Sequence, residues 1–403
     1  MLRSSSMKRT VLVVAVFSLL SAGAAVAQPP AGQCVIGPGM GSTVLYPYFE
    51  VDLDDAQGVT TLISINNGEL DPTLVRVVLW TDWGIPTLAF DVWLDGLDIQ
   101  TINLRSVFGG TIPSTGAGQD LSDFDFCDAF PPDHANPALT VDERNQLAAD
   151  HQGKPGPLDG INCAGQDYDD GIARGYITAD VIDECSGVEG FNPFFTPANT
   201  GWPYFADGGD PSGIAIIDNR LWGDLIYVDF NNNSAQGSEA ISLWADAGEF
   251  AGGNIFTFYG GLSGFDGRDD RVPLPRLWDQ RFLNGGPFAG GADLLIYNDN
   301  AVAPEFAACG NQPSWFPLNA LGFALDEGAD NFVDLGGGFA PVVTQRLPVS
   351  SFGIPYDFGL LEISTPNNQS WVQPTLSAGG LFSAAFNGTP ILFTCDITPG
   401  PPV

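Results

Sequence analysis

The sequence predicts a mainly β protein: an antiparallel β-sandwich with two related β units, a long disulfide-stapled loop region and one short helix. Three observations predict this class. Short β-rich segments recur along the chain, 50 Gly and 31 Pro indicate many turns, and six cysteines are widely spaced. Because 44% of the residues are hydrophobic and 11% aromatic, disorder does not explain the composition.

Residues 1–27 are interpreted as a secretory signal peptide. Basic residues at Lys8 and Arg9 precede an apolar run, Val11–Leu20, and Ala25–Ala27 supplies a small-residue cleavage site. The apolar run is shorter than the roughly 20 residues that a membrane span requires. We therefore expect a mature chain without a transmembrane segment, located in the periplasm, outside the cell or at its surface.

All six cysteines follow the expected cleavage site, and their even number indicates the disulfide framework of an exported protein. They are Cys34, Cys127, Cys163, Cys185, Cys309 and Cys395. No two form a C-x-x-C motif, which excludes redox, zinc-ribbon and c-type haem motifs. Among the connectivities that six cysteines allow, we favour Cys34–Cys395, Cys127–Cys163 and Cys185–Cys309, which would pin the termini and long loops.

The first β unit is expected over residues 28–115. Leu62–Ile65 ends in a turn signal, and Leu74–Trp80 is an almost continuous β-rich run. Leu88–Leu94 alternates strictly with period two, which predicts a strand with one apolar face. Another strand, Ile99–Leu104, is expected after the turn at Asp95 and Gly96.

A Cys/Pro/Gly-rich insertion is expected over residues 116–213. One helix is predicted inside it near residues 141–151, because Thr140 and Glu143 match a capping box and Gly153 ends the pattern. Tyr176–Val181 is expected to return to the main body as a strand.

The second β unit is expected over residues 214–403. Its expected strands are Ile214–Ile217, Leu225–Phe230, Ala240–Trp244, Ile255–Tyr259, Leu294–Tyr297, Val342–Val349, Gly359–Ile363 and Ile391–Thr394. An internal repeat relates VDLDDAQG at 51–58 to VDFNNNSAQG at 228–237, and each copy is expected to form a hairpin around an acidic loop. Chance similarity, or convergence on hairpin chemistry, is the alternative.

Four short strings resemble those of a group of uncharacterised exported bacterial proteins. They are Leu45–Phe49 (LYPYF), Val51–Leu53 (VDL), Gly175–Thr178 (GYIT) and Leu221–Asp224 (LWGD). The resemblance spans most of the mature chain and implies export and a β fold. It implies no activity and no site residue.

The charge balance restricts the partners. With 48 acidic and 14 basic residues, the formal net charge is −34, so the chain repels nucleic acid and anionic membrane surfaces. A solvated acidic surface that keeps an exported protein monomeric explains this balance, and so does a saline or calcium-rich habitat.

Catalytic motifs are weak. The nearest string to a serine elbow, Gly261–Gly264, lacks the spacing of G-x-S-x-G. Only His134 and His151 could act as histidine bases, and His151 is interpreted as the favourable C-terminal cation of the expected helix. Carboxylate pairs arise from composition alone among 48 acids. The sequence therefore favours binding or structure over enzymatic activity.

Two kinds of binding site are candidates. Asp91, Trp93 and Asp95 share one strand face and would form a sugar-stacking platform if that face were solvated. In the alternative, Trp93 packs under a loop or against the second unit. Calcium is the candidate cofactor, because three loops carry closely spaced oxygen ligands. These are Asp52, Asp54 and Asp55, then Asp229, Asn231 and Asn233, then Asp167, Asp169 and Asp170. Asx turns are the alternative use of those side chains.

The leading functional hypothesis is a non-enzymatic extracellular or cell-surface β protein with a structural, adhesive or ligand-binding role, whose partner is a glycan or a surface protein. The alternative is a secreted carbohydrate-binding or carboxylate-dependent carbohydrate-active protein. A surface-filament subunit would require an unpaired edge strand and an extended terminal segment to fill it.

Overall fold

The computed structural model describes residues 39–113, 138–183, 189–190, 215–246, 257–259, 270–285, 291–299, 307–311, 321–326, 331–334, 343–365 and 369–377. All of them belong to one compact unit, Ile36–Phe393. Residues 1–35 and 394–403, which include the expected signal peptide, lie outside the described residues. The described chain is mainly β with antiparallel sheets, which confirms the predicted fold class.

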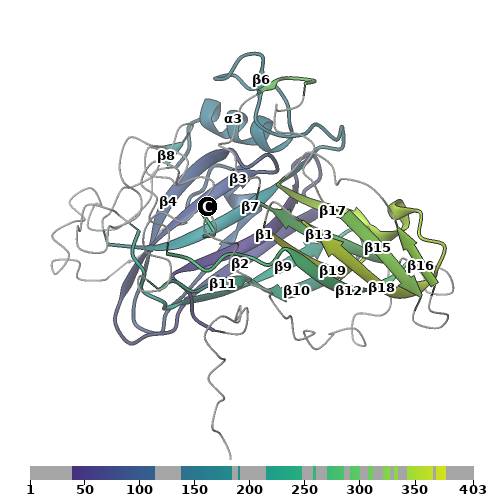
Figure 1. Ribbon diagram of the computed structural model, residues 1–403. Coiled ribbons are helices and arrows are strands. Elements are labelled where there is room, and N and C mark those ends of the chain that lie inside the picture. The colour runs from purple at the N-terminus through teal and green to yellow at the C-terminus, as the bar shows by residue number, and fades with distance from the viewer. Residues whose placement is uncertain are drawn as a thin grey trace, which may run out of the picture. The chain divides into compact units, whose positions relative to one another are not determined.

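A six-stranded sheet with the order β11-β1-β7-β3-β4-β8 forms the centre of the fold (Figure 1). Its strands are β1 (Thr43–Asp52), β3 (Thr73–Thr81), β4 (Pro86–Leu94), β7 (Ile172–Ile182), β8 (Glu189–Gly190) and β11 (Ile241–Leu243). β3 is buried along its whole length. The continuous apolar run Leu74–Trp80 therefore reflects a strand that is covered on both faces.

A four-stranded sheet, β10-β9-β2-β5, packs on one face of the central sheet. Its strands are β2 (Val59–Asn67), β5 (Ile99–Asn103), β9 (Leu221–Asp229) and β10 (Ser234–Glu239). Ile63 and Leu225 from this sheet share a buried core with Val77 and Phe90 of the central sheet. Two antiparallel sheets around one apolar core make a β-sandwich.

The other face of the central sheet is covered too. Trp80 and Tyr176 stack with ring centroids 5.6 Å apart, and Tyr297 meets Tyr176 edge-on at 5.0 Å. Phe258 and Val343 belong to the same buried cluster. The central sheet is thus a middle layer between two cores.

The C-terminal part of the fold contains a second pair of sheets with a core of their own around Trp278, Leu294 and Leu361. The first sheet has the order β12-β18-β15-β16 and the second β17-β13-β19, while β14 pairs with β6. Their bounds are β6 (Asn162–Cys163), β12 (Leu277–Leu283), β13 (Ala292–Asn298), β14 (Ala307–Ala308), β15 (Leu321–Asp326), β16 (Asn331–Asp334), β17 (Thr344–Pro348), the 3₁₀-helix η2 (Val349–Phe352), β18 (Phe358–Ser364) and β19 (Ser370–Leu376).

Two α-helices are described, one of them predicted. Helix α3 (Val141–His151) carries the expected capping box, in which Thr140 and Glu143 satisfy each other's backbone N–H groups. Helix α2 (Leu104–Phe108) was missed, because the strand was expected to run through Leu104. Asn103 ends that strand by accepting a 3.0 Å hydrogen bond from the backbone N–H of Arg105, which caps the new helix.

Most expected strands are present, with a few exceptions. Of the expected strand Ile214–Ile217, Ile214 lies outside the described residues, and the rest is not a strand, since Ala215 forms only an isolated bridge. Residues 257–259 form a bend and a turn where the end of a strand was expected, and Ile255 lies outside the described residues. The polar strand β10 was missed because its sequence, SAQGSE, has no apolar alternation. The expected strand Ile391–Thr394 also lies outside the described residues.

The two expected β units are interleaved, because β1 pairs with β11 and β2 pairs with β9. The hairpin expected at 51–58 is therefore wrong: β1 and β2 belong to different sheets, and the acidic loop between them connects the two layers of the sandwich. A hairpin does form at 228–237, but its second strand is the unexpected polar β10, whereas the apolar segment that follows, β11, pairs with β1.

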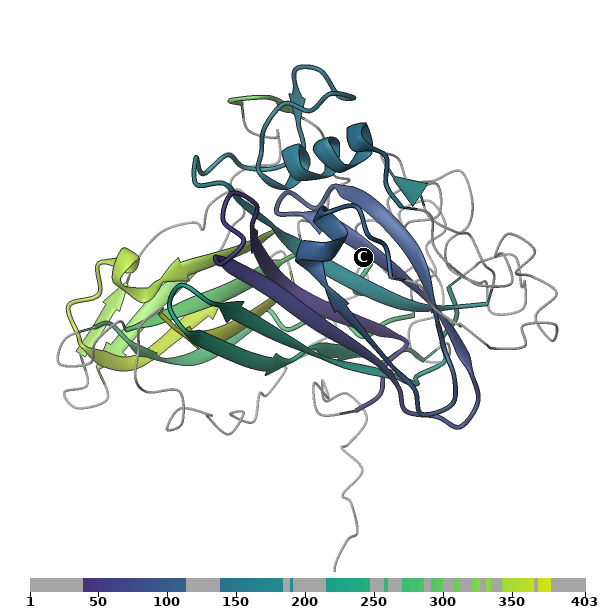
Figure 2. The same cartoon turned by 180° about the vertical axis from the view of Figure 1, so that it is seen from behind.

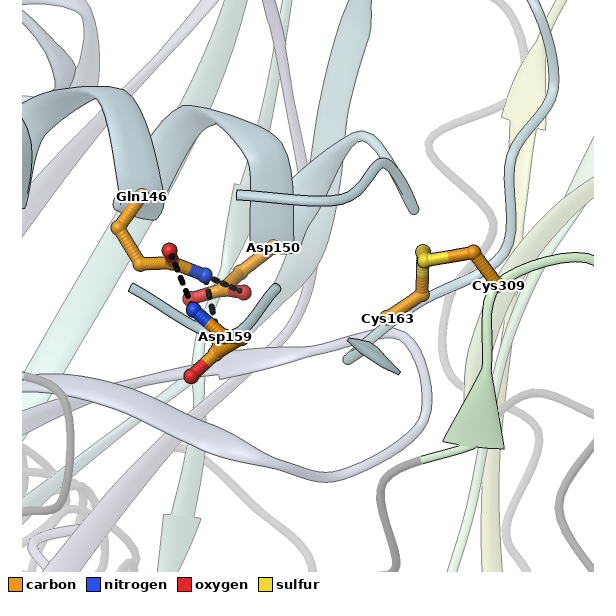
Figure 3. Close-up of a disulfide and its surroundings, with 5 residues drawn as sticks. All are labelled: Gln146, Asp150, Asp159, Cys163 and Cys309. Atoms are coloured by element: carbon orange, nitrogen blue, oxygen red, sulfur yellow. Dashed lines mark hydrogen bonds between the residues drawn. A yellow bond between two sulfur atoms is a disulfide. The ribbon is translucent and has the colours of Figure 1, made fainter. Parts of the chain in front are cut away.

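One disulfide is described, Cys163–Cys309, across 146 positions of sequence (Figure 3). It overturns the expected pairs Cys127–Cys163 and Cys185–Cys309. The bond joins β6 to the residue that directly follows β14, beside the buried Trp83, so the three-dimensional pairing of these short strands brings the two sulfurs together. Cys34, Cys127, Cys185 and Cys395 lie outside the described residues.

Candidate functional site

The structure does not make an open platform of Asp91, Trp93 and Asp95. The side chain of Asp91 is fully buried and forms a 2.8 Å ion pair with Arg76 on the neighbouring strand. Trp93 is only 6% exposed and packs in the core on the far side of the central sheet, while Asp95 is exposed. The alternative is correct, because the second face of β4 is covered rather than solvated.

Asp91 is one end of a buried polar row across the central sheet. Thr43, Asp180, Arg76 and Asp91 are direct neighbours on β1, β7, β3 and β4, so their side chains share one face. All four are buried, and Arg271 joins them with an Nε–Oδ1 distance of 3.6 Å to Asp180. Buried opposite charges held this way fix strand register.

Side chains from the loops further link this row. The hydroxyl of Tyr259 donates to both oxygens of Asp180, at 3.1 and 3.0 Å. Arg271 also donates to Thr43 Oγ1 and lies over the ring of Tyr259, 5.7 Å from its centroid. Because these polar groups are already bonded to one another inside the fold, they are not available to a ligand, which favours a structural role for the row.

The three loops predicted to bind calcium lie next to one another (Figure 2). Asn231 donates from its backbone to Gln57 O and from its side chain to Asp55 Oδ2, both at 3.0 Å. Leu53 N donates to Gly171 O at 3.2 Å, which joins the third loop to the first. The internal repeat thus places its two acidic loops side by side, which the sequence did not indicate.

Arg105 from α2 lies among the carbonyl groups of the first loop. Its Nη1 donates to Asp52 O and Asp55 O at 2.6 and 2.9 Å, and its Nη2 donates to Gly58 O and Val59 O, both at 2.9 Å. Backbone carbonyl oxygens converging on one cation are typical of a metal loop. Here a guanidinium supplies that positive charge, and sequence reasoning missed it because Arg105 is about 50 positions away.

The carboxylates of the three loops make Asx turns. Asp52 Oδ1 accepts from the backbone N–H groups of Asp54 and Asp55 at 3.0 and 2.9 Å, and Asp167 Oδ1 accepts from Asp169 N at 2.8 Å. Asp170 instead pairs with Arg174. No cluster of three or more His, Cys, Asp or Glu suited to a metal occurs in the part of the chain that the structure describes. Calcium binding at these loops stays a prediction.

Helix α3 places a neutral histidine inside the fold. His151 Nδ1 lies 2.8 Å from Arg174 O and Nε2 lies 2.7 Å from Thr87 Oγ1, which fits a ring that donates at Nδ1 and accepts at Nε2. Burial lowers the pKa of His151 to about 4. The residue is therefore a satisfied core histidine and not the helix-terminal cation expected from the sequence. His134 lies outside the described residues.

Asp150 on this helix and Asp82 are two buried carboxyl groups with raised pKa values. Gln146 Nε2 donates to Asp150 Oδ1 at 2.8 Å and to Asp159 Oδ2 at 2.5 Å (Figure 3). Burial, with the neighbouring Asp159, raises the pKa of Asp150 well above its ordinary value. Burial also raises the pKa of Asp82 to about 7. Perturbed carboxyls are typical of functional sites, but Asp82 and Asp150 have almost no solvent contact.

The exposed aromatic surface lies on β9 instead. Leu221, Gly223, Leu225 and Tyr227 point into the core, so the alternate residues of β9 face outward. Trp222 on that outer face is 42% exposed, in the same row as Asn66 and Ile99. The next row contains Asp224 and Glu239. Period-two alternation in LWGDLIY predicts this surface, but the expected strand Leu225–Phe230 begins too late to include Trp222.

In the part of the chain that the structure describes, no helix combines the length and the apolar character needed to cross a membrane. No significant similarity connects the chain to a protein-family profile, to a curated protein or to a solved structure. A functional proposal therefore has to rest on the geometry of the described residues.

Proposed function

We propose that the chain is an exported, non-enzymatic β protein that works by binding a partner at its surface, in an adhesive or structural role. This proposal rests on one observation, the contrast between buried ionic side chains and exposed apolar ones. The central ionic groups Arg76, Asp91, Asp180 and Arg271 are buried and bonded to one another, whereas large apolar side chains such as Trp222 are presented on the outer face of β9.

Export is supported by two independent features. The N-terminal pattern matches a signal peptide, and the Cys163–Cys309 disulfide is of the kind that persists in oxidising compartments. Expression with the native N-terminus should yield a mature chain that starts at Gln28 and has no free thiol at Cys163 or Cys309. A cytosolic product with reduced sulfurs at both positions contradicts export.

Carbohydrate binding is the second candidate, and Trp222 is the observation that favours it. An exposed indole can stack on the C–H face of a pyranose, and nearby carboxylates such as Asp224 and Glu239 accept hydrogen bonds from its hydroxyl groups. The strong negative charge of the chain favours neutral glycans over acidic ones.

A glycan array with matched tryptophan variants tests this candidate. Trp222 and Trp244 are both 42% exposed, but only Trp222 lies on the outer face of β9 beside Asp224. We expect Trp222→Ala to abolish binding to neutral glycans and Trp244→Ala to preserve it. Equal losses in both variants, or no binding by the native chain, contradict carbohydrate recognition at this face.

A further inference from the structure

We propose that Leu70, Leu97 and Ile99 form a docking surface for a partner protein that presents an apolar pocket rimmed by Lys and Arg. This inference rests on the proposed surface-binding function and gives it a place and a partner chemistry. We call these three residues the leucine tips. Leu70 and Leu97 occupy the turns after β2 and β4, and Ile99 begins β5.

The leucine tips are strongly exposed. Leu70 is 79% exposed and Leu97 is 61% exposed, and Ile99 is exposed as well. A single exposed leucine is common on protein surfaces. Two leucines on adjoining turns and the isoleucine that begins β5 form a patch, and exposed apolar patches typically mark interaction sites.

The backbone of Leu97 is unfavourable for a leucine. Its φ is +60°, in the left-handed region that residues with a Cβ rarely adopt. The bond from Asp98 N to Asp95 O, 3.2 Å long, closes the turn around it. At the third residue of such a turn, glycine or asparagine is preferred. In the isolated chain, Leu97 therefore has both an unfavourable backbone conformation and an exposed side chain.

At the neighbouring position, Gly96, sterics explain the residue type, whereas no such reason explains Leu97. A Cβ on Gly96 would lie 1.9 Å from the carbonyl oxygen of Leu70, so only glycine fits where the two turns meet. The close contact of the turns therefore fixes Gly96. A left-handed, exposed Leu97 is explained by a contact outside the chain, in the way that strained residues cluster at binding sites.

The two turns are held in one arrangement by Asn67. Its buried side-chain amide donates to Asp71 O at 2.7 Å and to Asp95 O at 2.9 Å. Leu97 N also donates to Glu69 O at 2.8 Å. The turns project side by side at the lower right of Figure 2. A preorganised apolar surface loses little freedom on binding, which favours affinity.

The charges around the leucine tips specify the partner. Glu69, Asp71, Asp95 and Asp98 are all exposed on the same two turns, so an apolar centre is surrounded by carboxylates. A pocket rimmed by Lys and Arg complements this arrangement. A second copy of this chain, an anionic membrane or a nucleic acid would meet like charge, because the chain carries a net charge of −34.

Photo-crosslinking of the full mature chain in the cells that produce it tests the proposal. Benzoylphenylalanine is placed at position 70 or 97, and for comparison at position 222. Phe358, which is also exposed but lies on β18, is the control position. We expect one discrete adduct from each leucine position and none from Phe358. The adduct should weaken as salt rises, and its partner peptide should map to an apolar pocket flanked by Lys and Arg.

A stability measurement separates docking from a structural role. Leu97→Gly removes both the side chain and the backbone strain, so we expect its melting temperature to equal or exceed that of the native chain. The same substitution should reduce the adduct formed from position 70 roughly tenfold, as expected for a central interface residue. Leu70→Ser should reduce the adduct from position 97 in the same way without unfolding the chain.

The remaining outcomes overturn the proposal in distinguishable ways. An adduct with twice the mass of the chain indicates self-association, and co-flotation with phosphatidylcholine vesicles without an adduct indicates lipid binding. Adducts from Trp222 or Phe358 but not from the leucine tips leave surface binding intact and remove this site. Absence of any adduct at all these positions contradicts the proposed surface-binding function itself.

Discussion

Arg76 and Asp91 lie directly opposite each other on β3 and β4, and their side chains form a 2.8 Å ion pair with no exposed surface. The pair sits on the face of the central sheet that also contains Trp93. A charge in such a place is stable only with its partner, because water cannot solvate it there. This contact therefore links the sheet's register to its stability.

Asp91→Asn should lower the free energy of unfolding by about 3–5 kcal/mol, because it leaves Arg76 buried without its full counter-charge. Urea denaturation measures the change. Asp95→Asn, at an exposed position directly after β4, is the matched control and should stay within about 0.5 kcal/mol of the native chain. Equal effects of the two substitutions would falsify the structural role assigned to Asp91.

The contribution of Asp82 and Asp150 to stability should fall as the pH rises above about 4. In the unfolded chain Asp82 and Asp150 lose their protons near pH 4, whereas burial keeps both protonated in the folded chain, with a pKa of about 7 for Asp82 and a raised pKa for Asp150. As the pH rises, the unfolded state therefore releases these protons before the folded state does. The stability that each carboxyl contributes is lost as the pH passes its folded pKa.

His151 acts in the opposite direction between about pH 4 and 6.5, which is the lower part of the range in which the carboxyls act. Its folded pKa of about 4 lies below its ordinary value near 6.5, so its contribution is complete above pH 6.5 and is lost as the pH falls toward 4. Thermal melts between pH 6.5 and 9 therefore isolate the carboxyls. Asp150→Asn should flatten that slope, while the exposed Asp142→Asn should leave it unchanged; parallel slopes in all three proteins contradict the assignment.

The Cys163–Cys309 disulfide should contribute roughly 3–5 kcal/mol, because it closes a loop of 146 positions. Replacing both cysteines by alanine should lower the urea midpoint accordingly. Peptide mapping under non-reducing conditions should recover the two cysteines in one linked pair. Recovery of Cys163 linked to Cys127 instead would restore the pairing expected from the sequence.

Arg105→Ala should loosen the loop between β1 and β2, since the guanidinium donates to four of its backbone carbonyls. We expect a loss of about 2 kcal/mol and faster proteolysis between Asp52 and Gly58. Arg144→Ala is the control, because its side chain makes only a long 3.4 Å bond to Gly109 O. Protection of the loop equal to that of the native chain counts against the role given to Arg105.

Calcium titration of the same proteins bears on the predicted cofactor. A calcium-dependent rise in the melting temperature of the native chain supports the predicted loops as ligands. A rise that appears only in Arg105→Ala indicates that the guanidinium stands where a metal ion would otherwise bind.

Local patterns identified much of the central fold. The alternation of Leu88, Phe90, Val92 and Leu94 predicts their common apolar face, and all four lie in the sandwich core. The capping box at Thr140 predicts the start of α3. Each of these features depends on residues within one strand or one helical turn, so the chain contains the whole signal in a short stretch.

The strings that carry the family resemblance have a structural explanation that needed the fold. Tyr46 of LYPYF lies opposite Ile177 of GYIT. A Cβ added to Gly223 of LWGD would lie only 2.4 Å from the Tyr46 hydroxyl, so glycine is required there. Three segments distant in sequence thus meet in one core. Their residue types follow from this packing, while the resemblance to exported proteins stays a prediction.

Local sequence patterns were sufficient for the fold class, the faces of the predicted strands and helix α3, because hydrogen bonding and side-chain alternation act between near neighbours. The folded chain was needed to show that Asp91 and Trp93 are buried, that Cys163 bonds to Cys309 and that Arg105 fills the acidic loop. Each of these depends on which distant segment covers a given face, and burial and charge pairing between distant segments leave no periodic signal in the chain.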